Sequence, residues 1–282
     1  MRENKIFPLA QAKAQIRKAI VIKLGGSSLA SESTLDELSR LISGYRARGK
    51  NVVVVHGGGP AINEELTQRG ITWSFVNGQR VTTPEMIEVI DEVLGSYVNS
   101  AVVGNLKADG IPATGLSGAN HEILSCSQLN EELGLVGQVD EVDAAAIVAA
   151  LKNGRVPVIA PIGFANCDDG GSQKKFNVNA DWAATKIAIA LRAEKLIFLT
   201  DQNGVLDGKR DLVSRATPYD LKEMIGTGVV SGGMCTKVLA MIVALESGVS
   251  QVRVLNAGAA SRMLDRKKIG TTLAFARERV TA

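Results

Sequence analysis

Five runs of aliphatic residues, each followed by glycines or a polar turn, constrain the fold of this chain more than any other feature. Segments with apolar residues at helical spacing separate these runs from one another. Strands of a parallel sheet that is covered on both faces are nearly continuous in aliphatic residues, and helices connect them. The alternation therefore predicts an α/β fold with a doubly wound, mostly parallel sheet. The predicted strands are residues 19–24, 52–55, 156–162, 195–200 and 252–256.

The composition narrows the class of protein. Of the 282 residues, 45% are hydrophobic but only 4% are aromatic, so small aliphatic side chains fill the core. A formal charge of +3, with lysine and arginine scattered along the chain, gives no indication of a nucleic-acid partner. Cys126, Cys167 and Cys235 form no CxxC pair, and we see neither a signal peptide nor a membrane-spanning run. We expect a cytoplasmic protein with no membrane partner.

Capping signals indicate where several helices begin. Thr34 and Glu37 have the spacing of a capping box, and Thr83-Pro84 combines an N-cap with proline at the first helical position. The helix after Pro84 carries apolar residues over a wide arc as far as about Lys107, more than one face of a sheet usually covers. This surplus is buried either inside a large monomer or at the two-fold interface of a homodimer.

The remaining segments suggest how the chain is divided. Residues 1–18 form either a short amphipathic helix or a frayed tail, residues 111–139 form hairpins or edge strands over the site, and residues 142–151 form a helix. No linker interrupts the chain. We expect an N-terminal acceptor-binding lobe, residues 19–175, and a C-terminal nucleotide-binding lobe, residues 176–282, that share one continuous sheet.

Two lysines stand beside glycine-rich turns. Lys23 precedes Gly25-Gly26 at the end of the first predicted strand, and Lys237 follows Gly232-Gly233. A third turn, Gly57-Gly58-Gly59, follows the second strand. Glycine lets backbone N–H groups approach an anion closely, and a lysine in a buried strand must face a counter-charge. One Gly-Gly turn alone is often an ordinary connection, but the combination predicts a site that brings ATP close to a second anion.

Common nucleotide-binding patterns do not account for these turns. Ile62 occupies the position of the third glycine of a Rossmann fingerprint, and residues 204–210 lack the spacing and the final Ser or Thr of a P-loop. Asp181, in the first turn of a predicted helix, supplies a carboxylate for the lysines; the alternative is that Asp181 and Asn179 only cap that helix. We interpret His56 as a structural residue that orients the glycine loop. No cluster has metal-ligand spacing, so we expect Mg²⁺ to arrive with ATP.

The chain resembles the amino acid kinase family, and within it the members that phosphorylate N-acetyl-L-glutamate. The resemblance covers residues 19 to 273, and it depends on six motifs that occur in the same order as in the family. They are Lys23-Leu-Gly-Gly26, His56-Gly-Gly-Gly59, Asn77-Gly-Gln-Arg80-Val-Thr82, Asn177-Val-Asn-Ala-Asp181, Leu199-Thr-Asp201-Gln-Asn-Gly204-Val and Gly232-Gly-Met-Cys-Thr-Lys237.

The resemblance implies a fold and a role for each motif. The fold is an open αβα sandwich. Lys23 and Lys237 stabilise the phosphoryl group in transfer, and Asp181 holds both lysines in place. The acceptor contacts Gly58, Gly59, Arg80, Asn177 and Asn179. ATP contacts Gly25, Gly26, Thr200, Asp201, Gly204, Val205, Leu206, Asp207, Gly232, Gly233 and Met234.

Some features differ from the family pattern. Gln202 replaces a small aliphatic residue, and the segments 255–261 and 272–278 lack the acidic and aromatic residues of arginine-inhibited members. We therefore expect a homodimer that responds little to arginine. Two other functions stay open at this point. One is a related kinase acting on another carboxylate, such as carrier-bound aminoadipate, and the other is a non-catalytic amino-acid sensor.

Overall fold

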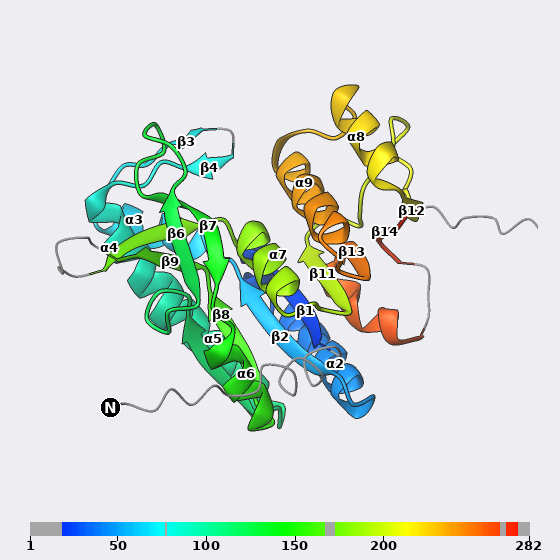
Figure 1. Ribbon diagram of the computed structural model, residues 1–282, viewed down its shortest axis with the longest axis horizontal. Coiled ribbons are helices and arrows are strands. Elements are labelled where there is room, and N and C mark those ends of the chain that lie inside the picture. The colour runs from blue at the N-terminus through cyan, green and yellow to red at the C-terminus, as the bar shows by residue number, and fades with distance from the viewer. Residues whose placement is uncertain (1–18, 77, 167–172, 266–268, 276–282) are drawn as a thin grey trace, which may run out of the picture.

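Figure 1 shows a computed structural model of the chain, which describes residues 19–76, 78–166, 173–265 and 269–275. The predictions for residues 1–18 and for Cys167 lie outside these ranges.

The main sheet has eight strands in the part of the chain that is described, and it contains strands from both sides of residue 175. β1 lies in the middle and pairs in parallel with β2 on one side and β11 on the other. β13 and β14 pair in antiparallel orientation. The predicted α/β fold with a mostly parallel sheet is confirmed. In spatial order the strands are β12 (Arg215–Ala216), β14 (Thr271–Leu273), β13 (Gln251–Asn256), β11 (Lys195–Thr200), β1 (Ala19–Leu24), β2 (Asn51–His56), β8 (Val156–Ala160) and β5 (Ala113–Ser117).

Helices cover both faces of this sheet and make it the centre of an αβα sandwich (Figure 1). Ile20 and Ile22 of β1 are buried on the face under α2 and α5, whereas Val21 is buried on the face under α7 and α9. Both faces of the strand are therefore apolar, which explains its continuous aliphatic sequence. The helices are η1 (Gly26–Ala30), α2 (Glu32–Ala47), α3 (Gly59–Gln68), α4 (Pro84–Glu92), η2 (Val93–Val98), α5 (Asn99–Ala108), α6 (Ala145–Lys152), α7 (Ala180–Ala190), α8 (Pro218–Gly226), α9 (Gly232–Glu246) and η3 (Ala257–Asp265).

A small closed barrel beside the sheet was not predicted. Within residues 111–139, β6 and β7 do pair as an antiparallel hairpin, but they belong to this barrel, and β5 is an edge strand of the main sheet. The predicted strand 156–162 ends at Ala160, and the chain enters the barrel at Ile162. The barrel strands are β6 (Leu124–Gln128), β7 (Val136–Val142), β9 (Ile162–Ala165) and β10 (Lys174–Val178), and a separate hairpin consists of β3 (Phe75–Val76) and β4 (Gln79–Arg80).

The capping box predicted at Thr34 is wrong. α2 begins at Glu32, and the Thr34 amide donates to the carbonyl of Ser31 at 3.0 Å. The Glu37 carboxylate, which was expected to cap this helix, accepts a hydrogen bond of 2.9 Å from the amide of Ser261. Its partner lies on η3, which packs on α2, so local spacing could not reveal it.

The start predicted at Thr83-Pro84 is confirmed, since Thr83 Oγ1 accepts a hydrogen bond from the Met86 amide at 3.3 Å. The following helical run contains a π-helical segment, η2, between α4 and α5. Nearly all apolar residues of the whole run from α4 to α5 are buried within the chain, while Tyr97 is 60% exposed. The surplus of apolar residues that suggested a dimer interface is thus largely buried in the core of the single chain. The buried residues are Met86, Ile87, Ile90, Val93, Leu94 and Val102.

The start predicted for α6 is also wrong, because Val142 is the last residue of β7 and the helix begins at Ala145.

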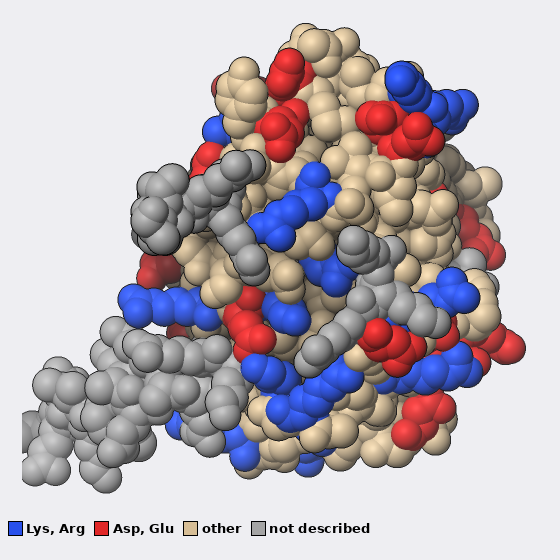
Figure 2. Space-filling view, turned by 90° about the vertical axis from the view of Figure 1, so that its right-hand side faces the viewer, with Lys and Arg blue, Asp and Glu red and all other residues tan. Residues whose placement is uncertain are grey.

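Figure 2 shows the side of the molecule on which α8, β12 and β14 lie in Figure 1. Basic and acidic side chains are interspersed there. No described helix is both long and apolar enough to cross a membrane.

Candidate active site

The site lies where β1 and β2 end. Because these strands are parallel and paired from Ala19 to Leu24, the glycine turn after each of them leaves the sheet at the same edge. The Gly57 amide donates to the carbonyl of Leu24 at 2.9 Å, and the Gly25 amide donates to the carbonyl of Leu199 at 3.0 Å. The first bond holds the Gly57 turn against the end of β1, and the second holds the Gly25 turn against β11.

The nitrogens of Gly58 and Gly59 lie close to the backbone of Gly26. A Cβ atom on Gly26 would lie 2.7 Å from each of these two nitrogens. No described residue accepts a hydrogen bond from either amide. A side chain at position 26 would therefore cover both donors, and glycine at this position leaves them uncovered. This is a cradle for an anion, at the N-terminus of α3, where the helix dipole also favours negative charge.

Asp181 lies between the two lysines, as the sequence predicted. Asn179 caps α7, accepting a hydrogen bond from the Asp181 amide at 2.9 Å, and so fixes the first turn of the helix. Asp181 Oδ1 forms an ion pair with Lys23 Nζ at 2.9 Å, and Oδ2 accepts a hydrogen bond from Lys237 Nζ at 2.8 Å. All three side chains are less than a tenth exposed. The three charges are therefore buried together, where an unpaired charge would be very costly.

The pKa values within this group reflect that burial. Burial by itself raises the pKa of the Asp181 carboxyl, but the positive charges of Lys23 and Lys237 outweigh it and hold the pKa below its usual range. Burial lowers the pKa of the Lys237 ammonium, and the charge of Asp181 opposes this effect. The cluster carries one more positive than negative charge, so it can attract a further anion.

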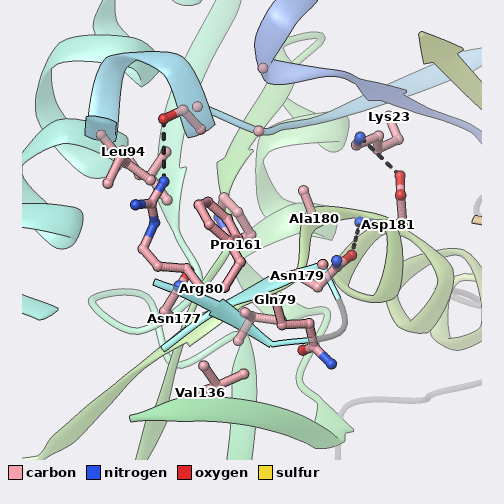
Figure 3. A pocket seen from close by; sticks show the side chains of 18 residues that line it. Lys23, Gln79, Arg80, Leu94, Val136, Pro161, Asn177, Asn179, Ala180 and Asp181 are labelled. Carbon is pink, nitrogen blue, oxygen red and sulfur yellow. Dashed lines mark hydrogen bonds and ion pairs between the residues drawn. The ribbon is translucent and has the colours of Figure 1, made fainter. Parts of the chain in front are cut away.

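Arg80 lies across the cavity from this cluster (Figure 3). Its Nη2 donates to Asn63 Oδ1 and, at 3.4 Å, to the carbonyl of Gly59. Its guanidinium carbon lies 4.8 Å from the ring centroid of Phe75 and 5.8 Å from that of Trp73. Nη1 is buried and has no hydrogen-bond partner among the residues that the structure describes. Burial lowers the pKa of the guanidinium. A buried, unpaired donor of this kind indicates a missing anionic partner.

Asn177 reaches the same cavity from β10. Its Nδ2 donates to Thr82 Oγ1 at 3.1 Å, and the Thr82 hydroxyl in turn donates to the carbonyl of Arg80 at 3.0 Å. Thr82 therefore joins the Asn177 side chain to the Arg80 backbone, and holds two strands that lie far apart in the sequence in one arrangement.

The cavity between these groups has a volume of about 230 Å³. All five residues predicted to contact the acceptor line it, together with Lys23, Gly26 and Asp181. Several apolar or neutral residues that were not predicted to contact the acceptor complete its walls. They are Ile62, Phe75, Gln79, Leu94, Val136 and Pro161.

The residues predicted to contact ATP, apart from Gly26, do not line this cavity. Thr200 ends β11, and Gly232 and Gly233 open α9. Asp207 Oδ1 accepts hydrogen bonds of 2.9 Å from the amides of Lys209 and Asp211, so this oxygen closes a turn. Val205 is fully buried, and its amide donates to Thr271 Oγ1 at 2.8 Å. The nucleotide contacts assigned to these residues stay predictions.

The fold and this arrangement of charges are those of a phosphotransferase, and the chain belongs to the amino acid kinase family, which it matches over residues 18–256. Among its relatives, the acetylglutamate kinase of Citrifermentans bemidjiense is 40% identical over an alignment of 269 residues, which covers 90% of this chain and 90% of its own. The acetylglutamate kinase of Cereibacter sphaeroides is 38% identical over 84% of this chain and 80% of its own. A solved structure, smu.665 from Streptococcus mutans, is 28% identical with a TM-score of 0.78, covering 91% of this chain and 98% of that one.

Proposed function

We propose that this protein transfers the γ-phosphoryl group of ATP to the γ-carboxylate of N-acetyl-L-glutamate. The similarity to acetylglutamate kinases over most of the chain supports this function. Its main structural support is the position of Asp181, held between Lys23 and Lys237 at one side of a cavity whose other side presents an unpaired Arg80 nitrogen. The two carboxylates of a dicarboxylate could therefore bind at opposite sides of the cavity, one near the lysines and one at Arg80.

The acceptor would lie between these two sides. Arg80 Nη1 and Asn177 would bind the α-carboxylate, since a guanidinium and an amide can both donate to its oxygens. The uncovered amides of Gly58 and Gly59 would donate to an oxygen of the γ-carboxylate. Asn179 lines the same wall. Each of these donors has a position that fits an anion.

The chemistry needs no general base. A carboxylic acid with a pKa near 4.3 is already ionised at neutral pH. Its oxygen attacks the γ-phosphorus of ATP, a new P–O bond forms, and the bond from that phosphorus to the bridging oxygen breaks. ADP leaves with the electron pair, and the product is an acyl phosphate. Electrostatics are the main obstacle, because two like charges at 4 Å repel by about 4 kcal/mol at an effective dielectric near 20. Lys23 and Lys237 would offset this repulsion and stabilise the phosphoryl oxygens.

ATP would lie on the other side of the lysines. The turn at Gly25-Gly26, the segment from Thr200 to Asp207 and the start of α9 at Gly232 would surround it. Among the described residues, no group of three or more His, Cys, Asp or Glu side chains could hold a metal ion. Mg²⁺ that arrives with ATP would supply charge neutralisation at the phosphates.

Trapping of the product with hydroxylamine tests the acceptor. The purified protein with ATP, Mg²⁺ and N-acetyl-L-glutamate should yield a hydroxamate, and the Lys237→Met variant should yield very little. Hydroxamate from 2-aminoadipate derivatives but not from N-acetyl-L-glutamate would assign a different acceptor. Binding of amino acids without ATP turnover would instead favour a sensor.

We also propose that the protein is a cytoplasmic homodimer whose activity changes little with arginine. Light scattering at micromolar protein, with and without millimolar arginine, measures the assembly, and the same samples give the activity. A monomer mass would overturn the dimer, and a hexamer with strong inhibition would overturn the expected response to arginine.

A further inference from the structure

His56, the last residue of β2, is buried and lies between Asn99 and the glycine turn. Asn99 Nδ2 lies 2.9 Å from the carbonyl oxygen of Val158 and 3.1 Å from His56 Nε2. His56 Nδ1 lies 2.9 Å from the carbonyl oxygen of Gly57. Asn99 and His56 thus connect β8 to the peptide between Gly57 and Gly58.

These contacts allow only one assignment of the protons. A carbonyl oxygen only accepts, so the Asn99 atom that faces Val158 must be its NH₂ group, and this group's second hydrogen points to His56 Nε2. Nε2 must then be the acceptor nitrogen of a neutral ring. The proton is on Nδ1, which donates it to the carbonyl of Gly57. Burial, which lowers the pKa of His56 to about 4, keeps the ring neutral.

The hydrogen bond to Gly57 fixes the orientation of the next amide. In a trans peptide the C=O and N–H groups point in opposite directions, and the described chain has no cis peptide bond. With the Gly57 carbonyl directed at the His56 ring, the N–H of Gly58 is directed away from it. Gly58 lines the acceptor cavity, and no described residue accepts a hydrogen bond from its amide.

Two features of the surrounding helices and strands make room for Asn99. The π-helical segment η2 ends at Val98, just before it. Residues i and i+5 lie about 140° apart around an α-helix, whereas a π-turn brings them towards one face. Leu94, against which a Cβ on Gly58 would clash at 2.3 Å, and Asn99 therefore both face the turn. On the other side, a Cβ on Gly115 would lie 2.1 Å from Asn99 Oδ1.

We propose that Asn99 and His56 are positioning residues that hold the Gly58 N–H towards the acceptor carboxylate. The role in acceptor binding rests on the function proposed above. Neither residue touches the substrate. Both ring nitrogens of His56 are occupied, so the ring takes no part in proton transfer. Asn99 fixes the tautomer of His56, and that tautomer fixes the orientation of the peptide between Gly57 and Gly58.

Nitrogen NMR of the histidine rings tests the first half of this proposal without any ligand. The chain has two histidines, so a His121→Gln variant assigns the signals. We expect His56 to show a protonated Nδ1 and an unprotonated Nε2 at neutral pH. An Nε2-protonated or doubly protonated ring would overturn the proposal. Because this measurement needs neither substrate nor a substitution at the site, it stays decisive even if the protein acts on a different acceptor.

Two substitutions at His56 test the second half. In His56→Asn the side-chain amide can still donate to Gly57 from nearly the position of Nδ1. In His56→Gln the side chain is closer in size to histidine, but its amide reaches towards Asn99. We expect His56→Gln to lower kcat/KM for the acceptor by roughly tenfold to a hundredfold, with the KM for ATP nearly unchanged, and His56→Asn to retain most of it.

Asn99→Leu should resemble His56→Gln in this split between the two substrates. If packing alone mattered, His56→Gln would be the milder variant, and the KM values for both substrates would change together. Either result would overturn the proposal. If wild-type protein makes no acyl phosphate from N-acetyl-L-glutamate, the proposed function fails, while the ring-nitrogen signals still decide between the tautomers.

Discussion

Lys237 Nζ lies 2.8 Å from Asp181 Oδ2, although 56 positions separate the two residues in the sequence. Asp181 lies in the first turn of α7, and Lys237 lies in the second turn of α9, so the packing of these two helices sets the distance between the charges. Lys23 reaches the same carboxylate from β1. The position of each ammonium group therefore depends on the core of the sandwich rather than on a loop.

Replacement of either lysine by methionine removes one charge and keeps most of the side-chain volume. We expect Lys237→Met and Lys23→Met each to lower kcat by roughly 10²–10³-fold, the usual loss for one preorganised donor, with a smaller change in the KM for ATP. Lys222→Met, at an exposed ion pair with Glu246, is the matched control. Steady-state kinetics measure both constants, and a wild-type kcat would remove that lysine from the mechanism.

An alanine at Gly26 should close the anion cradle. Its Cβ would lie 2.7 Å from the Gly58 and Gly59 nitrogens, and backbone atoms cannot move aside as a flexible side chain can. We expect Gly26→Ala to lose acceptor binding in calorimetry and to lower kcat/KM for the acceptor by about a hundredfold or more. Gly226→Ala in α8, where a Cβ has no neighbour within 4 Å, is the control. Normal acceptor binding in Gly26→Ala would place the anion elsewhere.

Arg80 should affect the acceptor and not the nucleotide. Arg80→Ala removes a charged hydrogen bond of about 1.5–3 kcal/mol, so we expect the KM for N-acetyl-L-glutamate to rise by roughly tenfold to a hundredfold. The KM for ATP should stay nearly constant. Arg69→Ala, which breaks partly exposed ion pairs with Glu65 and Glu92, controls for the loss of an arginine from the same region. If the acceptor KM does not change, Arg80 does not bind the acceptor.

Stability should depend on pH through His56. Its pKa is about 4 in the folded chain and 6.5 when unperturbed, so between these values the unfolded chain binds the extra proton. The free energy of unfolding is therefore highest above pH 6.5 and falls towards pH 4, by up to about 1.4 kcal/mol per pH unit. Urea unfolding of His56→Asn should lack this component, while His121→Gln should keep it. Folding lowers the pKa of Asp181 from 3.8, so its stabilising contribution is present above that value and is lost mainly as the pH falls below it. Parallel curves for wild type and His56→Asn would contradict the prediction.

Much of the fold and of the charged centre could be predicted because their signals are local. The aliphatic runs identified β1, β2, β11 and β13, and the parallel arrangement alone implied that their glycine turns meet at one edge. Asn179 was placed correctly at the start of α7, where its side chain accepts from the Asp181 amide. That Lys237 reaches the same place followed from the family resemblance, since no local pattern connects it to Asp181.

The barrel and the surroundings of Arg80 could not be predicted, because both depend on distant contacts. β10 pairs in parallel with β7 and in antiparallel with β9, and strands this short have no distinctive periodicity. The stacking of Arg80 on Phe75 and its bond to Asn63 join three separate segments. The π-helical segment η2 interrupts a run whose apolar spacing resembles one long α-helix.

The separation between barrel and sandwich has a consequence for how substrate choice can change. The groups assigned to phosphoryl transfer, Lys23, Asp181 and Lys237, come from β1, α7 and α9. Two residues that face the acceptor cavity, Val136 and Pro161, belong to the barrel and to its connection with β8. Exchange of barrel residues can thus lengthen or shorten the acceptor space without disturbing the catalytic charges. Mutations in the barrel can thus change the substrate of such a protein during evolution, while the residues that transfer the phosphoryl group stay the same.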